Sequence, residues 1–173
     1  MALYEFFPNY IWNLSVAIAL ENGGKIGEIV DMCKPIQDAA ANGDDAGTGE
    51  FLVEWVKKAD TLVELASEDL AAGREYSAGN KLKRASIYYV TAERMQGQGH
   101  PGRMETYKKA LAAFGDGTGY VQDNIERVEI PYGEGKKLSG LLTLAEGDGP
   151  RPLVVFCNGL DSCKEMLWLG GFP

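Results

Sequence analysis

The chain has 173 residues, with 17 lysines and arginines against 25 aspartates and glutamates, and a net charge of −8. Its content of 45% hydrophobic and 24% charged residues is ordinary for a globular protein. The 22 glycines follow no G-X-Y period, which excludes collagen. The acidic balance argues against broad nucleic-acid binding and against adhesion to anionic membranes, so we expect neither kind of partner.

We expect a cytoplasmic protein. A secretion signal would have a basic region and an A-x-A cleavage site, and the N-terminal residues have neither. The most apolar early stretch, residues 11–20, is too short to span a bilayer. The three cysteines, Cys33, Cys157 and Cys163, do not form a disulfide framework, which favours a reducing compartment.

The first 120 residues repeat with the period of α-helices. The first predicted helix has one apolar face, made of Phe7, Ile11, Leu14 and Ile18, and ends at residues 22–24. A second short helix carries Ile26, Ile29, Val30 and Cys33, and Pro35 kinks or ends it. Residues 42–49 are predicted to form a polar, glycine-rich loop.

Three longer helices are predicted next. The third begins near Thr48 and ends at Gly73. Its wide apolar stripe comprises Phe51, Leu52, Trp55, Val56, Ala59, Leu62, Val63, Ala66 and Leu70. The fourth has Leu82, Ala85, Tyr89 and Ala92 on one face. The fifth begins with Pro101 at its first position and ends at Gly115.

The spacing of small and aromatic residues between positions 73 and 92 also fits a tetratricopeptide-type helical hairpin. Only one such unit is visible, whereas stacked repeats need about three for stability. A helical subdomain with small residues at close helix crossings is therefore the favoured interpretation. The alternative, a non-catalytic peptide-binding module formed by residues 1–115, stays open.

After residue 120 the apolar period becomes two, which predicts an antiparallel hairpin with a turn at residues 133–136. The alternating positions are Val128, Ile130 and Tyr132, then Leu138, Gly140, Leu142 and Leu144. The continuous apolar run at 153–157 predicts a strand buried on both faces. A helix is predicted to start near Cys163, capped by Asp161 or Ser162. A sheet with such a central strand needs more strands than these residues supply.

Several motifs are better explained by structure than by chemistry. The G-x-G-x-x-G pattern at 97–102 follows a helix, not the strand that a dinucleotide site needs, and it predicts a helix–helix loop. The glycine- and lysine-containing run at 133–137 is predicted to be the turn of the hairpin and not a binding loop. His100, the single histidine, is expected to be a helix cap. Cys157 and Cys163 lack further ligands at zinc spacing and are expected to be a buried small hydrophobe and a helix-start residue. We expect neither a cofactor nor a metal.

The loop at residues 158–162 has a possible catalytic use. A strand, a loop and a helix together place free backbone N–H groups at the carboxyl edge of a sheet, where α/β enzymes bind ligands. In α/β-hydrolases the equivalent loop donates one oxyanion-hole N–H. Spacing favours the N–H of Leu160 as that donor, with Gly159 giving the backbone room to turn and Asn158 and Asp161 as neighbours. A plain strand-to-helix connection explains the pattern equally well.

The run at residues 152–166 resembles a particular α/β-hydrolase group. That group contains 2,6-dihydroxypseudooxynicotine hydrolase, fungal polyketide chain-shortening hydrolases and esterases like the fermentation-respiration switch protein. The hairpin at 128–142 and the helical segment at 84–89 are also similar to theirs. The resemblance implies the α/β class: an N-terminal helical lid domain at residues 1–119, followed at 120–173 by the first strands of a hydrolase core whose sheet is incomplete here.

The activity that the resemblance implies is that of a serine hydrolase with a Ser-His-Asp triad. It would cleave a carbon–carbon bond of a diketone-like, polyketide or aromatic substrate, or an ester. No G-x-S-x-G nucleophile motif occurs in the chain, so the nucleophilic serine, the aspartate and the histidine are expected beyond Pro173. The expected partners are an apolar or aromatic small-molecule substrate, the remainder of the same hydrolase chain and, as a weaker expectation, a second copy in a homodimer.

Overall fold

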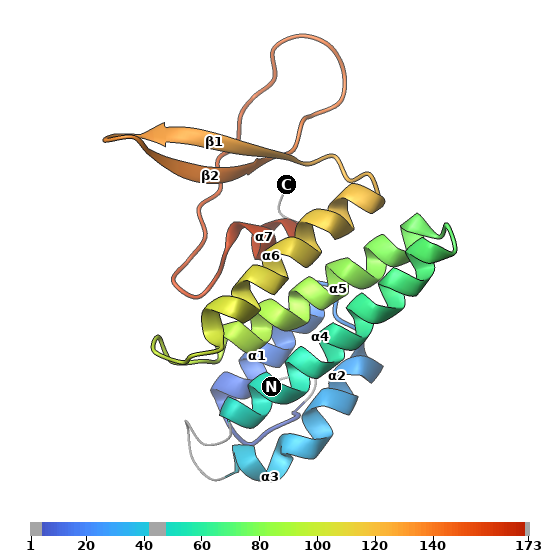
Figure 1. Ribbon diagram of the computed structural model, residues 1–173. Helices are drawn as coiled ribbons and strands as arrows, with labels where there is room; N and C mark the ends of the chain where they lie inside the picture. Colours follow the sequence, from blue (N-terminus) through green and yellow to red (C-terminus); the bar gives the residue numbers. More distant parts are fainter. Residues whose placement is uncertain (1–4, 42–47, 172–173) are drawn as a thin grey trace. The chain divides into compact units, whose positions relative to one another are not determined.

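The computed structural model describes residues 5–41 and 48–171 (Figure 1). It divides into a helical unit, Met1–Val121, and a strand unit, Gln122–Pro173, each compact by itself. Most of the polar loop predicted at residues 42–49 lies outside the described residues, as do the first four residues of the chain. The assignment of residues 1–119 as a lid and 120–173 as a hydrolase core stays a prediction.

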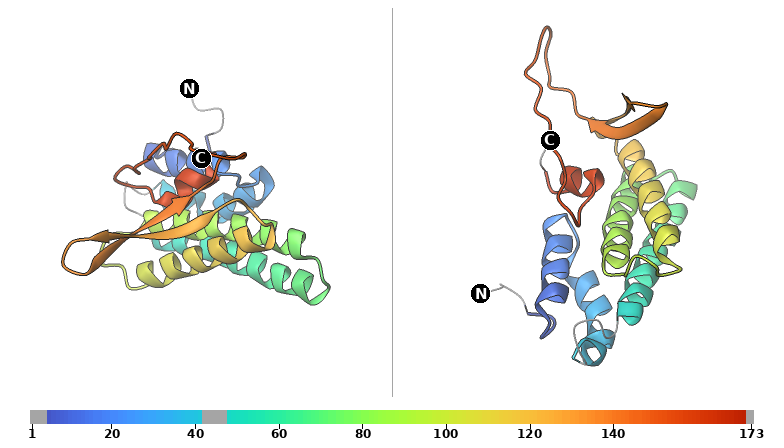
Figure 2. Two further views of the ribbon diagram at one scale, coloured as in Figure 1. Left: turned by 90° about the horizontal axis from the view of Figure 1, so that it is seen from above. Right: turned by 90° about the vertical axis from the view of Figure 1, so that its left-hand side faces the viewer.

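The helical unit consists of six α-helices and one 3-10 turn in its described part. In chain order they are α1 (Tyr10–Glu21), α2 (Ile26–Cys33), η1 (Lys34–Ile36), α3 (Gln37–Ala40), α4 (Thr48–Ala71), α5 (Glu75–Arg94) and α6 (Arg103–Tyr120). Helix α5 packs between α4 and α6, and α1 and α2 lie on one side of this layer (Figures 1 and 2). Pro35 lies in η1, so the second helix ends where the sequence predicted.

Helix α1 buries a different face from the predicted one. Asn9 caps the helix, because its Oδ1 accepts hydrogen bonds from the N–H groups of Ile11 at 2.8 Å and Trp12 at 3.2 Å. The buried residues are Trp12, Ser15, Val16 and Ala19. Ile11 and Leu14 are instead exposed. One position along a helix is a turn of about 100°. Burying the larger Trp12 therefore rotates its neighbour Ile11 out of the core.

The core of the helical unit is a chain of aromatic rings that joins α1, α4 and α5. The ring of Trp12 meets Phe7 and Phe51 edge-on, with centroids 5.1 Å apart in both pairs. Phe51 stacks on Trp55 at 4.7 Å, and Trp55 meets Tyr88 edge-on at 5.8 Å. Such aromatic pairs contribute about 0.5–1.5 kcal/mol each beyond the area they bury. These contacts fix three helices that are distant in sequence.

Helix α4 confirms the predicted stripe and its predicted end. Phe51, Trp55, Ala59, Leu62 and Ala66 of the stripe are buried. Gly73 adopts a φ of +71°, and the N–H of Arg74 bonds to the carbonyl of Asp69 at 2.8 Å. This left-handed C-terminal turn favours glycine because any other residue would place its Cβ against the backbone.

Helix α6 is longer than predicted. It continues through Gly115 to Tyr120. Its Gly117 lies against α5, where an added Cβ would come within 2.8 Å of the backbone nitrogen of Lys83 and 3.0 Å of the Gly79 oxygen. A Cβ on Gly79 would in turn meet the Gly117 oxygen at 2.9 Å. These glycines let two helix backbones approach closely, and they do not end the helix.

The strand unit contains the predicted hairpin. Strand β1 (Glu126–Tyr132) pairs antiparallel with β2 (Lys136–Leu142), from Glu126 opposite Leu142 to Tyr132 opposite Lys136. The turn residues Gly133, Glu134 and Gly135 all have positive φ, and Lys136 N–H bonds to the Gly133 carbonyl at 2.8 Å. Helix α7 (Lys164–Leu169) follows near the predicted start.

The strand predicted at residues 153–157 is absent from the described structure. Its side chains are exposed by 75% at Leu153, 68% at Val154, 74% at Val155 and 52% at Phe156. A strand buried on both faces needs hydrogen-bonded neighbours on both sides. Among the described residues, β1 and β2 pair only with each other, so the segment has no ladder to join.

Candidate functional site

The candidate site is the loop of residues 158–162, which connects the exposed apolar segment to α7. Cys163 occupies the N-cap position of α7, and its side chain makes no capping hydrogen bond. The prediction that Asp161 or Ser162 caps this helix is therefore wrong. The hydroxyl of Ser162 is turned into the loop instead.

Three hydrogen bonds close the loop on itself. The Oγ of Ser162 accepts from the backbone N–H of Gly159 at 3.0 Å. The Nδ2 of Asn158 donates to the carbonyl oxygen of Ser162 at 2.8 Å and to that of Gly159 at 3.2 Å. The first and the last residue of the loop are thus tied together through side chains.

The backbone N–H groups of Gly159 and Leu160 differ in their hydrogen bonding. The N–H of Gly159 is occupied by the Ser162 hydroxyl. Leu160 is 99% exposed, and no described residue accepts a hydrogen bond from its N–H. A fixed and accessible N–H of this kind can stabilise an oxyanion. Asn158 and Asp161 flank this pair in the same exposed loop, and the catalytic role of the four residues stays a prediction.

The cysteines differ in part from expectation. Cys157 is exposed, so its prediction as a buried hydrophobe is wrong, for the same reason that its segment forms no strand. Cys163 stands at the start of α7, as predicted. Burial raises the pKa of Cys163 to about 11 and that of Cys33 to about 12. Both thiols therefore stay protonated, and unreactive as nucleophiles, at neutral pH.

His100 lies in the loop between α5 and α6, and its prediction as a helix cap is wrong, because Gly102 is the N-cap of α6 and no side chain caps that helix. Its Nδ1 accepts a hydrogen bond from the backbone N–H of Gly102 at 3.3 Å, just before α6 begins. The G-x-G-x-x-G pattern at 97–102 is this same helix–helix loop, with no strand before it. It therefore lacks the geometry of a dinucleotide site.

The described part of the chain contains no group of three His, Cys, Asp or Glu side chains placed to hold a metal ion. In residues 5–41 and 48–171, no helix has the length and apolar character needed to cross a membrane.

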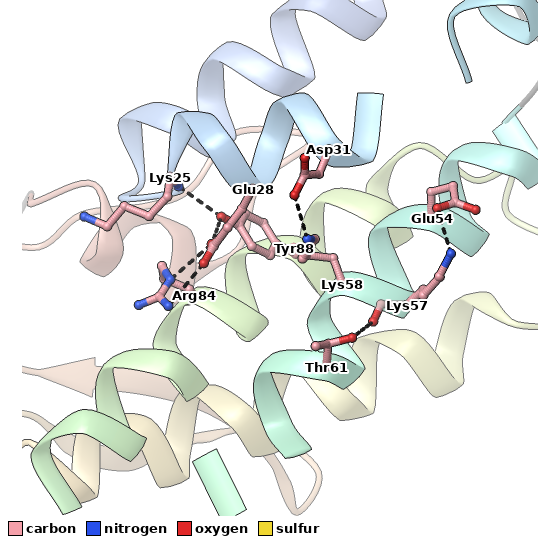
Figure 3. A network of polar contacts seen from close by, with 9 residues as sticks. All are labelled: Lys25, Glu28, Asp31, Glu54, Lys57, Lys58, Thr61, Arg84 and Tyr88. Atoms are coloured by element: carbon pink, nitrogen blue, oxygen red, sulfur yellow. Dashed lines mark hydrogen bonds and ion pairs between the residues drawn. The ribbon is translucent and has the colours of Figure 1, made fainter. Parts of the chain in front are cut away.

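One partly buried polar network was not apparent from the sequence (Figure 3). Tyr88 donates its hydroxyl proton to Glu28 at 2.5 Å and accepts from the N–H of Lys25 at 3.0 Å. Both Nε and Nη2 of Arg84 contact the two oxygens of Glu28 at 3.2 Å. Burial, and then the hydrogen bond to Glu28, raise the pKa of Tyr88 above its usual range. The network anchors α2 to α5, and no local spacing relates residues that lie 56 to 63 positions apart.

A second polar contact joins the three long helices. The hydroxyl of Tyr89 on α5 bonds to Asp60 on α4, and Lys109 on α6 reaches the same carboxylate at 3.0 Å. The Lys109 ammonium also lies 5.6 Å from the centroid of the Tyr89 ring. Burial raises the pKa of Tyr89, so the phenol remains a donor to Asp60. Every partner here is another residue of the helical unit, which indicates a structural role.

Comparison with known proteins identifies the family. The family model for FrsA-like esterases matches residues 45–169, which include α4 to α6, the hairpin, the candidate loop and α7. The chain belongs to this esterase family. The resemblance inferred from the sequence is thereby confirmed.

Individual relatives agree with the family. The chain is 27% identical to the alpha/beta hydrolase gkaG of Penicillium citrinum, over 97% of this chain and 40% of that protein. It is 29% identical to the alpha/beta hydrolase psoB of Aspergillus fumigatus, over 88% of this chain and 35% of the relative. The chain is 26% identical to esterase FrsA of Photobacterium profundum, over 69% of this chain and 28% of that protein. The chain thus spans less than half the length of these relatives.

These similarities bear on the two functional alternatives. A helix-rich chain with one small antiparallel sheet is consistent with part of an α/β-hydrolase. The tetratricopeptide alternative has no support, because the matching family is an esterase family and includes the same helical hairpin, α4–α5. The comparisons therefore favour membership of a hydrolase family over a repeat module.

Proposed function

We propose that this chain supplies the lid and the oxyanion loop of a serine-dependent α/β-hydrolase. The observation that carries the proposal is the 158–162 loop, which is closed on itself and leaves the N–H of Leu160 accessible, within the segment that matches the esterase family. An oxyanion hole needs donors of this kind, fixed before the substrate arrives. Gly159 allows the close approach of a substrate, since no atom lies within 4 Å of the position of its missing Cβ.

The proposed reaction is attack of a serine hydroxyl on a substrate carbonyl. The serine oxygen bonds to the carbonyl carbon, its proton passes to a histidine, and the carbonyl oxygen becomes an oxyanion held by the Leu160 N–H. Collapse of the tetrahedral intermediate breaks the bond to the leaving group, which takes the proton from the histidine. An ester thereby releases an alcohol, and a diketone releases an enolate that is protonated to a ketone. Water then releases the acyl group as a carboxylic acid and restores the serine.

The nucleophile, its histidine and its aspartate are proposed to lie beyond Pro173. No G-x-S-x-G sequence occurs in the 173 residues, and the one histidine, His100, is engaged with Gly102. In α/β-hydrolases the triad follows the oxyanion loop in chain order as serine, acid and histidine. This order agrees with the position of the candidate loop at residues 158–162.

The substrate is proposed to be an apolar or aromatic small molecule containing an ester or a diketone-like or polyketide carbon–carbon bond. The name esterase carried by the bacterial relatives favours the ester. Residues 1–119 would exclude water from the reacting carbonyl as a lid, in a cytoplasmic enzyme that can form a homodimer. The acidic chain makes nucleic acid and anionic membranes poor partners.

A fluorophosphonate probe tests the proposal. The intact hydrolase should be labelled at one serine in a G-x-S-x-G sequence encoded after Pro173, and residues 1–173 expressed alone should remain unlabelled. Hydrolysis of p-nitrophenyl butyrate and of a β-diketone by the intact enzyme then separates ester from carbon–carbon cleavage. Labelling of a serine within residues 1–173, or a coding sequence without the motif, would refute the assignment.

A further inference from the structure

The 158–162 loop is held by hydrogen bonds and not by packing. Residues 158–161 are all exposed, and the space where a Cβ of Gly159 would lie is empty. Three hydrogen bonds fix its backbone: the Gly159 N–H donates to the Ser162 hydroxyl, and the Asn158 amide donates to the carbonyls of Ser162 and Gly159. Removing either side chain would leave the backbone of the loop free to change conformation.

The same bonds select between the two possible oxyanion donors. Because the Ser162 hydroxyl occupies the N–H of Gly159, that group is withheld from a substrate. The next N–H along the chain, that of Leu160, has no acceptor among the described residues, and the residue is 99% exposed. Of these two neighbouring N–H groups, the closed loop therefore leaves only that of Leu160 open to a substrate.

We propose that Asn158 and Ser162 are positioning residues, which hold the loop so that the N–H of Leu160, and not that of Gly159, meets the oxyanion. The inference rests on the proposed function. It adds a role for Ser162 and distinguishes the N–H of Gly159, which is bonded within the loop, from the N–H of Leu160, which is open to the substrate. Its physical basis is that a preorganised donor costs no rearrangement at the moment of reaction. A displacement of about 1 Å in such a site can cost roughly 100-fold in rate.

The first experiment measures kcat and KM of the intact hydrolase with p-nitrophenyl butyrate. Ser162→Ala should lower kcat by about tenfold to 100-fold with little change in KM, because the donor acts mainly on the transition state. Ser162→Thr keeps a hydroxyl and should restore most of the lost kcat. Asn158→Asp keeps the shape but replaces the donating amide by a carboxylate, and should lower kcat at least as much as Ser162→Ala.

The control is Ser139→Ala, which removes an exposed hydroxyl from β2 in the same unit and should leave kcat unchanged. Unchanged kcat in both Ser162→Ala and Asn158→Asp would overturn the positioning role. A rise in KM at constant kcat would also contradict it, since that result indicates ground-state binding only.

The second experiment needs no catalysis and uses the 173-residue chain. In nuclear magnetic resonance spectra, the chemical shift of the Gly159 amide proton should depend only weakly on temperature, as expected for a hydrogen-bonded amide. In Ser162→Ala this temperature dependence should become as steep as that of the Leu160 amide proton. A Gly159 amide that behaves as solvent-exposed in the unaltered chain would refute the closed loop. An intact enzyme that neither hydrolyses the ester nor reacts with the fluorophosphonate would refute the proposed function and the positioning role, while the amide measurement would still decide the loop structure.

Discussion

The helical unit buries its largest apolar side chains, whereas the strand unit leaves several of its own exposed. Trp12 and Trp55 of the helical unit are completely buried, whereas Leu153 and Val155 of the strand unit are 75% and 74% exposed. A helix satisfies its backbone groups internally, so it needs only one partner face to bury its apolar stripe. A central strand needs two neighbouring strands before its side chains can be buried. An apolar sequence therefore predicts burial only where the required neighbours are present.

The largest expected effect comes from removing an aromatic ring that α4 contributes to the core. Trp55→Ala should lower the free energy of unfolding by about 3–5 kcal/mol, because the ring contacts both Phe51 and Tyr88. The matched change in the strand unit, Val155→Ala, should alter it by less than about 0.5 kcal/mol. Urea denaturation followed by circular dichroism measures both. Equal losses in the two variants would remove the contrast between the units.

A second test concerns the close approach of α5 and α6. Gly117→Val should destabilise the chain by about 2–3 kcal/mol, since its Cβ would collide with the backbone of α5. Gly119→Val, two residues later in α6, meets no atom within 4 Å and should change stability by less than about 0.5 kcal/mol. Thermal denaturation of the two variants makes the comparison. A Gly117→Val chain as stable as Gly119→Val would show that the helices do not cross so closely.

A smaller effect is expected from the ionic cluster that joins α4 to α5. Hydrogen bonds from Lys81, then Ser77 and Arg74, hold the pKa of Asp69 well below its usual range. The contribution of Asp69 is therefore present above the pKa of an unfolded aspartate, about 3.9, and is lost as pH falls below it. Asp69→Asn should be less stable at neutral pH and should lose less stability on acidification than the unaltered chain.

Urea denaturation between neutral pH and strongly acidic pH measures this difference. The control is Asp116→Asn, on the exposed side of α6, which should retain the full loss on acidification. Identical pH dependence in Asp69→Asn and the unaltered chain would contradict the role given to the cluster.

The mildest test leaves the fold intact and compares thiols. Iodoacetamide should modify Cys157, which is exposed, and spare Cys33, which is buried and has a pKa raised to about 12. Cys163, half-buried with a pKa of about 11, should react more slowly than Cys157. Mass spectrometry of peptides from the labelled chain gives the order. Protection of Cys157 would indicate that the 153–157 segment is covered in solution.

Features set by neighbours in the sequence were predicted well. The hairpin follows from strict alternation and from a turn rich in glycine, and Gly73 marks the end of α4 because a left-handed turn requires it. The identity of the loop before α7 also followed from local pattern. These features depend on interactions between residues only a few positions apart.

Features set by distant contacts were predicted less well. In α1 two stripes were possible, and the contact between Trp12 and Phe51 decides which one is buried. Gly115 was interpreted as the end of α6, because the close approach of α5 to the helix at Gly117, beyond that residue, cannot be read locally. In the candidate loop, the donor role of Leu160 stays a prediction. The bond between Ser162 and Gly159 was not predicted, since the same serine could equally have capped α7.

The exposed segment at residues 153–156 has a consequence for how the chain behaves in concentrated solution. Four consecutive exposed apolar side chains in a segment that is not part of a strand form the type of sequence that nucleates aggregation. Arg151 and Pro152 stand directly before the run and oppose this, one by its charge and the other by lacking an N–H. We therefore expect association to increase steeply with protein concentration and with salt, which screens the net charge of −8.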